Sequence, residues 1–270
     1  MKTRILTAAV AIPLLLLVLM VVDKAVAAVV WGVVMGIASY ELLFGTGLIQ
    51  EPRLVIYSCV MAFAVTVWSY FGAVHAFLLL MVMVFLGLLY SEMMISHVKI
   101  TFDKLALCVM GGFLMPFLLS SIIRILAMKI GRYVILIPFV IAFGSDSGAY
   151  FSGMFFGRHK LAPVISQHKT IEGVIGGLVA SILFMVIYAV VLQFNHFSVN
   201  YVNAILYGIL GSLIGSFGDL CFSVVKRQTG IKDYGNIIPG HGGILDRFDS
   251  MMFVGPLIEA LLILMPIIKG

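Results

Sequence analysis

The chain has 270 residues, of which 62% are hydrophobic and only 11% are charged, and its mean hydropathy is +1.17. Soluble domains usually carry about 25% charged residues, so this composition excludes a soluble globular protein and leaves no room for a separate polar domain. The formal net charge of +5 suits contact with anionic headgroups or nucleotides, although Lys and Arg in cytoplasmic loops produce the same excess.

Apolar runs of bilayer-spanning length recur along the whole sequence. They predict an all-α fold, a polytopic helical bundle of about nine transmembrane helices that forms a single membrane domain over residues 1–270. The first run resembles a signal peptide, but its apolar core is longer than the usual 7–15 residues, so we expect a transmembrane helix there. The spans are expected at residues 5–22, 26–45, 54–72, 74–94, 105–128, 133–156, 173–193, 202–225 and 251–268.

Charge divides the chain into an apolar helical half, residues 1–130, and a second half, residues 131–270, with charged loops near 157–172 and 226–250. With nine spans, one side of the membrane receives twelve of the 17 Lys and Arg residues. The positive-inside rule places that side in the cytoplasm. Both charged loops share a side, because two spans separate them.

Asp146 and Asp219 are carboxylates inside apolar runs. A charge at bilayer depth is costly unless it is paired, so such residues usually mark a functional site. On a helix, Asp219 would share one face with four polar residues that lead into the next loop, namely Ser212, Ser216, Ser223 and Lys226. A packing seam of small residues, with each Asp paired to Lys or Arg, is the alternative.

The loop near 226–250 carries most of the charged chemistry. Asp246 and Asp249 are three residues apart and would project from one helical face, an arrangement that suits Mg²⁺. A salt-bridged loop is the alternative. His241 lies between glycines, where it could contact phosphate or simply end a turn, and Gly242 and Gly243 would let backbone amides approach an anion.

The loop near 157–172 ends in Lys169 and Thr170, directly before a glycine-rich helix start. A helix N-terminus beside a Lys and a hydroxyl suits a phosphate group. The spacing of a P-loop is absent. Ordinary basic loop residues with a helix cap are the alternative.

These motifs together resemble the signature of phosphatidate cytidylyltransferases, the CDP-diacylglycerol synthases. The similar positions are Ser223-x-x-Lys226-Arg227, Lys232-Asp233, Pro239-x-His241-Gly242-Gly243 and Asp246-Arg247-Phe248-Asp249, with upstream Asp146-Ser-Gly-Ala-Tyr150, Gly157-Arg158, Pro163, Ile165-Ser166 and Lys169-Thr170-x-Glu172-Gly173. Gln167 departs from the family, which usually has Pro there. The resemblance covers the C-terminal half, and the N-terminal half matches only as a bundle of apolar helices.

The resemblance implies an enzyme that joins CTP and phosphatidate to give CDP-diacylglycerol and pyrophosphate, with Mg²⁺ and, as an open point, a second metal ion. We expect catalysis to depend on Asp219, Asp246, Asp249, Lys226 and His241. The expected substrate-binding residues are Lys169, Thr170, Ser223, Arg227, Lys232, Arg247, Gly242 and Gly243, and the expected metal ligands are Asp219, Asp246, Asp249 and Asp146.

The expected partners are the two substrates and membrane lipid, with no nucleic acid, and a homodimer is left open. The expected location is the bacterial inner membrane, with the active site facing the cytoplasm. A related enzyme that activates another lipid phosphate, such as an ether-linked phosphatidate, is the nearest alternative. A secondary transporter is a more distant one, because its charges should lie at mid-membrane within repeats. The signature of the CDP-alcohol phosphotransferases is not found.

Overall fold

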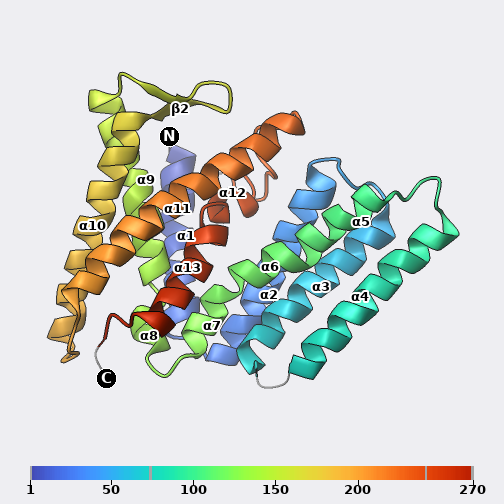
Figure 1. Ribbon diagram of the computed structural model, residues 1–270, viewed down its shortest axis with the longest axis horizontal. Helices are drawn as coiled ribbons and strands as arrows, with labels where there is room; N and C mark the ends of the chain where they lie inside the picture. The colour runs from blue at the N-terminus through green and yellow to red at the C-terminus, as the bar shows by residue number, and fades with distance from the viewer. Residues whose placement is uncertain (1, 73–74, 241, 269–270) are drawn as a thin grey trace. The chain divides into compact units, whose positions relative to one another are not determined.

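A computed structural model describes residues 2–72, 75–240 and 242–268 of the chain (Figure 1). The chain forms two compact units, one of Met1–Lys129 with Gln228–Phe248 and one of Ile130–Arg227 with Asp249–Gly270. The first unit thus includes residues 228–248, most of the second charged loop. The single membrane domain over residues 1–270 stays a prediction.

The first unit is built from apolar helices. Its elements are α1 (Lys2–Met20), α2 (Lys24–Tyr40), the π-helix η1 (Glu41–Gly45), α3 (Pro52–Phe71), α4 (His75–Ile95), α5 (Phe102–Val109), the π-helix η2 (Met110–Leu114), α6 (Met115–Leu119), α7 (Ser121–Ala127) and the short α12 (Leu245–Phe248). Its core includes Leu43, Leu54, Leu89 and Cys108, all fully buried. Small residues bring these helices close, since a Cβ placed on Gly112 of η2 would lie 2.8 Å from the Cα of Ser58.

The second unit contains α8 (Gly131–Val134), α9 (Ile137–Phe156), β1 (Lys160–Ala162), β2 (Ser166–Thr170), α10 (Ile171–Phe194), α11 (Tyr201–Gln228) and α13 (Met251–Leu264). Helices α9 and α10 lie side by side along a seam of small residues (Figure 1). A Cβ placed on Gly177 of α10 would lie 2.7 Å from the backbone oxygen of Ser145. Close backbone approach of this kind drives helix association where the surroundings are already apolar.

A β-hairpin connects α9 to α10, a feature that the sequence did not predict. Strands β1 and β2 are antiparallel, with Lys160 opposite Thr170 and Ala162 opposite Ser166. The side-chain oxygen of Thr170 accepts the Gly173 N–H at 3.1 Å and thereby caps α10. The hairpin is fastened to the end of α11, because Arg227 Nε donates to the Ile165 oxygen at 3.2 Å.

The all-α polytopic prediction is confirmed. Seven helices or runs of helices among the described residues are long and apolar enough to cross a membrane, and each coincides with a predicted span. The other two predicted spans coincide with α1, whose apolar part is Ala9–Met20, and with the 14-residue α13, which are both shorter. The long span at 102–127 is divided into three α-helical pieces around η2.

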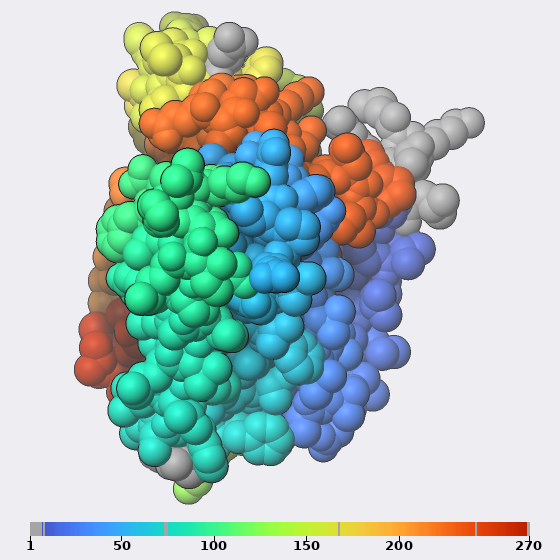
Figure 2. Space-filling view, turned by 90° about the vertical axis from the view of Figure 1, so that its right-hand side faces the viewer, coloured from blue at the N-terminus to red at the C-terminus, as the bar shows by residue number. Residues whose placement is uncertain are grey.

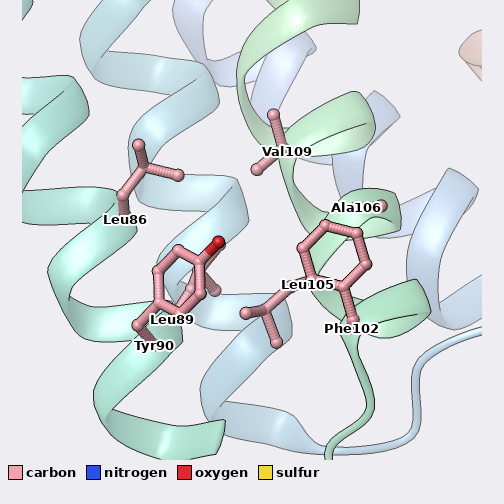
Figure 3. A pocket seen from close by; sticks show the side chains of 7 residues that line it. All are labelled: Leu86, Leu89, Tyr90, Phe102, Leu105, Ala106 and Val109. Carbon is pink, nitrogen blue, oxygen red and sulfur yellow. The ribbon is translucent and has the colours of Figure 1, made fainter.

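Helix α4 presents an uncovered apolar face, visible in teal in Figure 2. Only Phe85 and Leu89 are buried in this helix, while Leu79 and Met83 are 64% and 71% exposed. A groove of about 290 Å³ lies between α4 and α5 (Figure 3). Its lining is apolar except for one hydroxyl, and consists of Leu86, Leu89, Tyr90, Phe102, Leu105, Ala106 and Val109. This face suits hydrocarbon and offers nothing for a charged headgroup.

The seam between α9 and α10 should tolerate no added side chain. We expect Gly177→Val to destabilise the protein by about 1–3 kcal/mol, because its methyl groups have to displace backbone at Ser145. Thermal unfolding in detergent measures the effect. Gly87→Val on α4 is the matched control, since a Cβ there meets nothing within 4 Å. Equal melting temperatures for the two variants would contradict the close packing.

Candidate active site

Carboxylates and lysines meet in the second unit. Lys169 Nζ, at the end of β2, lies 2.6 Å from Asp219 Oδ2 on α11, and Lys226 Nζ lies 3.8 Å from Asp249 Oδ2. The Ser223 hydroxyl donates to Asp219 Oδ1 at 3.3 Å. The side chains of the two ion pairs are between 14% and 32% exposed, so water reaches them only in part.

The helical stripe predicted on α11 positions these groups. Its inner end is a packing contact, since the hydroxyls of Ser212 and Ser145 are 2.8 Å apart, and Ser145 directly precedes Asp146. Farther along α11, a Cβ on Gly218 would lie 3.4 Å from the Cα of Ser250. This close approach brings the start of α13, and with it Asp249, beside the Asp219 turn of α11. The stripe is therefore a packing seam at one end and a charged cluster at the other.

The carboxylates of this cluster repel one another. The pKa of Asp249 is raised to about 7, chiefly by burial and next by the negative charge of Asp219, whereas Lys226 opposes the shift. The charge of Asp146 also contributes to the increase. A carboxylate that is costly to ionise in this way gains most from a bound cation.

A polar pocket of about 490 Å³ lies in the first unit. It is lined by Lys232, Asp233, Asn236, Ile238, Gly240, Gly242 and Arg247. Gly240 and Gly242 have φ angles of 78° and 83°, which L side chains rarely adopt, so the turn around the pocket requires glycine. The Ile238 N–H donates to the Gly242 oxygen at 2.9 Å and closes this turn. The pocket therefore combines two cationic side chains with backbone that a ligand can approach closely.

Asp246 holds in place the loop at 228–248 that lines this pocket, the pocket loop. It is 7% exposed, and its Oδ2 accepts the backbone N–H groups of Tyr234 at 2.8 Å and Gly243 at 3.0 Å. Helix α12 ends at Phe248, so Asp246 and Asp249 do not lie on one continuous helix as we expected. The boundary between the two units falls directly after Phe248, which assigns the two carboxylates to different units.

Glu41 is a candidate residue that the sequence reasoning missed. It lies at the start of η1, is 2% exposed, and accepts the N–H groups of Ile244 and Leu245 in the pocket loop. The signal was present, because Glu41 is a carboxylate inside an apolar run, like Asp146 and Asp219. The N-terminal half therefore contributes more than apolar helices.

The remaining expected site residues have defined places. Thr170 uses its hydroxyl to cap α10, and Arg227 binds the hairpin backbone. His241 lies outside the described residues. The second unit thus groups Asp146, Lys169, Asp219, Ser223, Lys226 and Asp249, while the first unit places Lys232, Gly242, Gly243, Asp246 and Arg247 in or beside the pocket.

The donor set of the second unit fits Mg²⁺. Among the described residues, no group of three or more His, Cys, Asp or Glu side chains could hold a metal ion. Mg²⁺ needs fewer protein ligands, because it is usually held by one or two carboxylates together with water and substrate phosphates. The negative charges of Asp219 and Asp249 repel each other, and a cation beside them would offset that repulsion.

A sequence profile of the Cytidylyltransferase family matches residues 2–265, and the chain belongs to this family. It is 50% identical over 135 residues to a phosphatidate cytidylyltransferase of Staphylococcus haemolyticus, a stretch that covers 50% of this chain and 51% of the relative. An enzyme of that name from Staphylococcus aureus is 50% identical over 133 residues, 49% of this chain and 50% of the relative. The chain spans about half the length of these relatives.

The raised pKa of Asp249 predicts a pH-dependent effect of Asp249→Asn on stability. Between about pH 4 and pH 7 the folded chain keeps a proton that the unfolded chain has lost, so wild-type stability falls as the pH rises through that window. In detergent with EDTA, we expect Asp249→Asn to melt at the same temperature as the wild type near pH 4. At pH 8 we expect the variant to melt at a higher temperature than the wild type.

Asp103→Asn is the control, since Asp103 is an exposed carboxylate in the first turn of α5. Its melting temperature should stay at a constant offset from wild type over the same pH range. A gap between Asp249→Asn and wild type that does not grow with pH would contradict the raised pKa.

Proposed function

We propose that the chain is a phosphatidate cytidylyltransferase, an enzyme that transfers CMP from CTP to phosphatidate. Membership of the Cytidylyltransferase family supports this proposal, as do relatives that carry the name phosphatidate cytidylyltransferase. The observation that carries most weight is the pocket of about 490 Å³ with Lys232, Arg247 and glycine backbone, because it suits a polyphosphate.

The reaction requires alignment and charge neutralisation more than acid–base chemistry. A phosphate oxygen of phosphatidate attacks the α-phosphorus of CTP, a new P–O bond forms, and the bond from that phosphorus to the bridging oxygen breaks to release pyrophosphate. Phosphatidate is already an anionic nucleophile near neutral pH, so no covalent enzyme intermediate is needed. Holding both phosphates in line accounts for much of the rate.

The side chains of the chain then have separate tasks. In the proposal, Lys232 and Arg247 bind the triphosphate, with the backbone of Gly242 and Gly243 close to its oxygens. Lys169, Lys226 and Arg227 neutralise phosphate charge, while Ser223, Thr170 and His241 orient the ligands. Asp219 and Asp249, with Asp146, would hold Mg²⁺, which neutralises charge on the reacting phosphates when bound. Asp246, which we also expected as a ligand, lies in the first unit and stays a prediction from the family resemblance.

The surroundings of the enzyme are part of the same proposal. We place the chain in the bacterial inner membrane with its charged loops in the cytoplasm, where CTP is available, and the distribution of Lys and Arg supports this orientation. Membrane lipid surrounds the bundle, and a homodimer stays open. An enzyme that activates an ether-linked phosphatidate is the second candidate, because the charged motifs recognise phosphate groups and not the linkage of the lipid chains.

The direct test uses purified protein in mixed micelles with radiolabelled CTP. We expect phosphatidate-dependent release of pyrophosphate that stops in EDTA and returns with Mg²⁺. Parallel assays with an ether-linked phosphatidate separate the two candidate substrates. Full activity in EDTA would remove the metal from the proposal, and no CTP consumption with either lipid would overturn the function.

Asp219→Asn shows within this assay whether Asp219 binds the metal or only pairs with Lys169. As a ligand, its loss raises the Mg²⁺ concentration for half-maximal rate or abolishes activity, with little change in melting temperature. As one half of a structural ion pair, its loss costs about 3–5 kcal/mol of stability, and the Mg²⁺ response of the folded enzyme stays normal.

The pocket assignment predicts a specific defect in CTP binding. We expect Arg247→Gln to raise the KM for CTP about 10- to 100-fold, because charge-assisted hydrogen bonds to phosphate are lost. Steady-state kinetics at saturating phosphatidate measures the change. Arg53→Gln is the control, since Arg53 pairs with Glu92 on the surface and its side chain is 73% exposed. If both variants keep the wild-type KM, the pocket does not bind CTP.

A further inference from the structure

Glu41 lies where α2 changes into the π-helix η1. It is 2% exposed and belongs to a span of 22 residues, Lys24–Gly45, that is otherwise free of acidic residues. A buried carboxylate in an apolar helix needs compensating hydrogen bonds. The partners of Glu41 are more than 200 positions away in the sequence, in the pocket loop.

Both oxygens of the Glu41 carboxylate accept backbone amides. The Ile244 N–H donates to Oε1 at 3.0 Å and the Leu245 N–H donates to Oε2 at 2.8 Å. The two amides directly precede and begin α12, so they have no partner within that helix. A carboxylate offers two acceptors to two adjacent N–H groups, which a neutral side chain of the same length cannot do.

Two glycines of the loop pack directly against this carboxylate. A Cβ on Gly243 would lie 2.5 Å from Glu41 Oε2, and a Cβ on Gly235 would collide with Glu41 Oε1 and lie 2.8 Å from Cδ. A third close contact binds the loop to η1, since a Cβ on Gly45 would lie 2.6 Å from the Tyr234 oxygen. The loop therefore follows the shape of η1 and the Glu41 side chain closely.

The fastened segment is the one that lines the pocket. Asp246 ties Tyr234 to Gly243 within the loop, and Glu41 ties the next two residues to α2 and η1. Arg247, a cationic lining residue, lies two positions after Leu245. Glu41 acts on Arg247 indirectly, because it binds the backbone of Ile244 and Leu245, and these residues determine where the backbone of Arg247 lies.

We propose that Glu41 is a positioning residue that holds residues 242–247 in the conformation in which Arg247 binds the substrate triphosphate. The proposal rests on the proposed function, because it assigns the pocket to CTP. Glu41 itself touches no substrate. It acts by keeping two buried amides satisfied in one loop conformation, since an unsatisfied buried amide favours any alternative in which water reaches it.

The test combines hydrogen exchange with kinetics on Glu41→Gln in the full-length protein. Gln keeps the volume but offers one acceptor oxygen and turns an NH₂ group toward a backbone N–H. We expect the amides of Ile244 and Leu245 to exchange about 10- to 100-fold faster, as the loss of a hydrogen bond to a charged group implies. We expect the KM for CTP to rise at least about tenfold while the melting temperature stays close to that of the control.

Glu92→Gln is the matched control. Glu92 also lies in an apolar helix, where it accepts hydrogen bonds from Tyr57 and Arg53, two residues of α3. It should leave exchange at residues 244–245 and the KM for CTP at wild-type values. Gly235→Ala places a methyl group against the same carboxylate from the loop side. It should therefore reproduce the Glu41→Gln defects even if the Glu41→Gln protein fails to insert into the membrane.

The outcomes are separable. Unchanged exchange at 244–245 in both variants would overturn the proposal, and so would faster exchange with an unchanged KM, because Glu41 would then be structural only. Faster exchange with a raised KM supports positioning. A wild-type protein that consumes no CTP would instead overturn the proposed function, and that result is visible before any variant is made.

Discussion

The structure depends on the cost of leaving a charge unpaired in an apolar environment. With 62% hydrophobic residues, the chain has few polar groups to spare for its interior. Glu41 and Asp246 are both nearly inaccessible, and each is compensated by two backbone N–H groups. These four hydrogen bonds satisfy the acids and at the same time fix the loop that lines the polar pocket. Charge compensation and pocket formation are thus one requirement.

Small residues do the corresponding work between helices. Lipid is as apolar as the side chains it meets, so the hydrophobic effect gives helices little reason to associate, and close van der Waals contact has to supply it. Gly177 against Ser145, and Gly218 against Ser250, are such contacts. The second of these also brings Asp249 beside α11. The same glycines that hold the second unit together therefore set the distances within its carboxylate cluster.

Much of this could be predicted from the sequence. Length and hydropathy located the seven helices that are long and apolar enough to span a bilayer, because the thickness of the hydrocarbon core sets a minimum helix length. The spacing of Asp219, Ser223 and Lys226 predicted a common helical face, since residues three and four positions apart lie on the same side of an α-helix. The sequence could not reveal that Asp246 and Asp249 are separated by the end of α12, because two carboxylates three residues apart fit one continuous helix as well as a helix that ends between them. The β-hairpin and the partners of Glu41 depend on long-range contacts that no local pattern encodes.

The ion pairs of the second unit explain how a cluster of opposite charges can remain available to substrates. Lys169 lies 2.6 Å from Asp219, and Lys226 lies 3.8 Å from Asp249. In the resting protein Lys226 offsets Asp249, whose raised pKa reflects the cost of ionising it, and Lys169 pairs with Asp219. On the proposed function, a substrate phosphate would give each lysine a new anionic partner, while a cation would take its place beside each carboxylate. Both exchanges conserve charge, so ligands can replace the ion pairs without leaving an unpaired charge in a region of low dielectric constant.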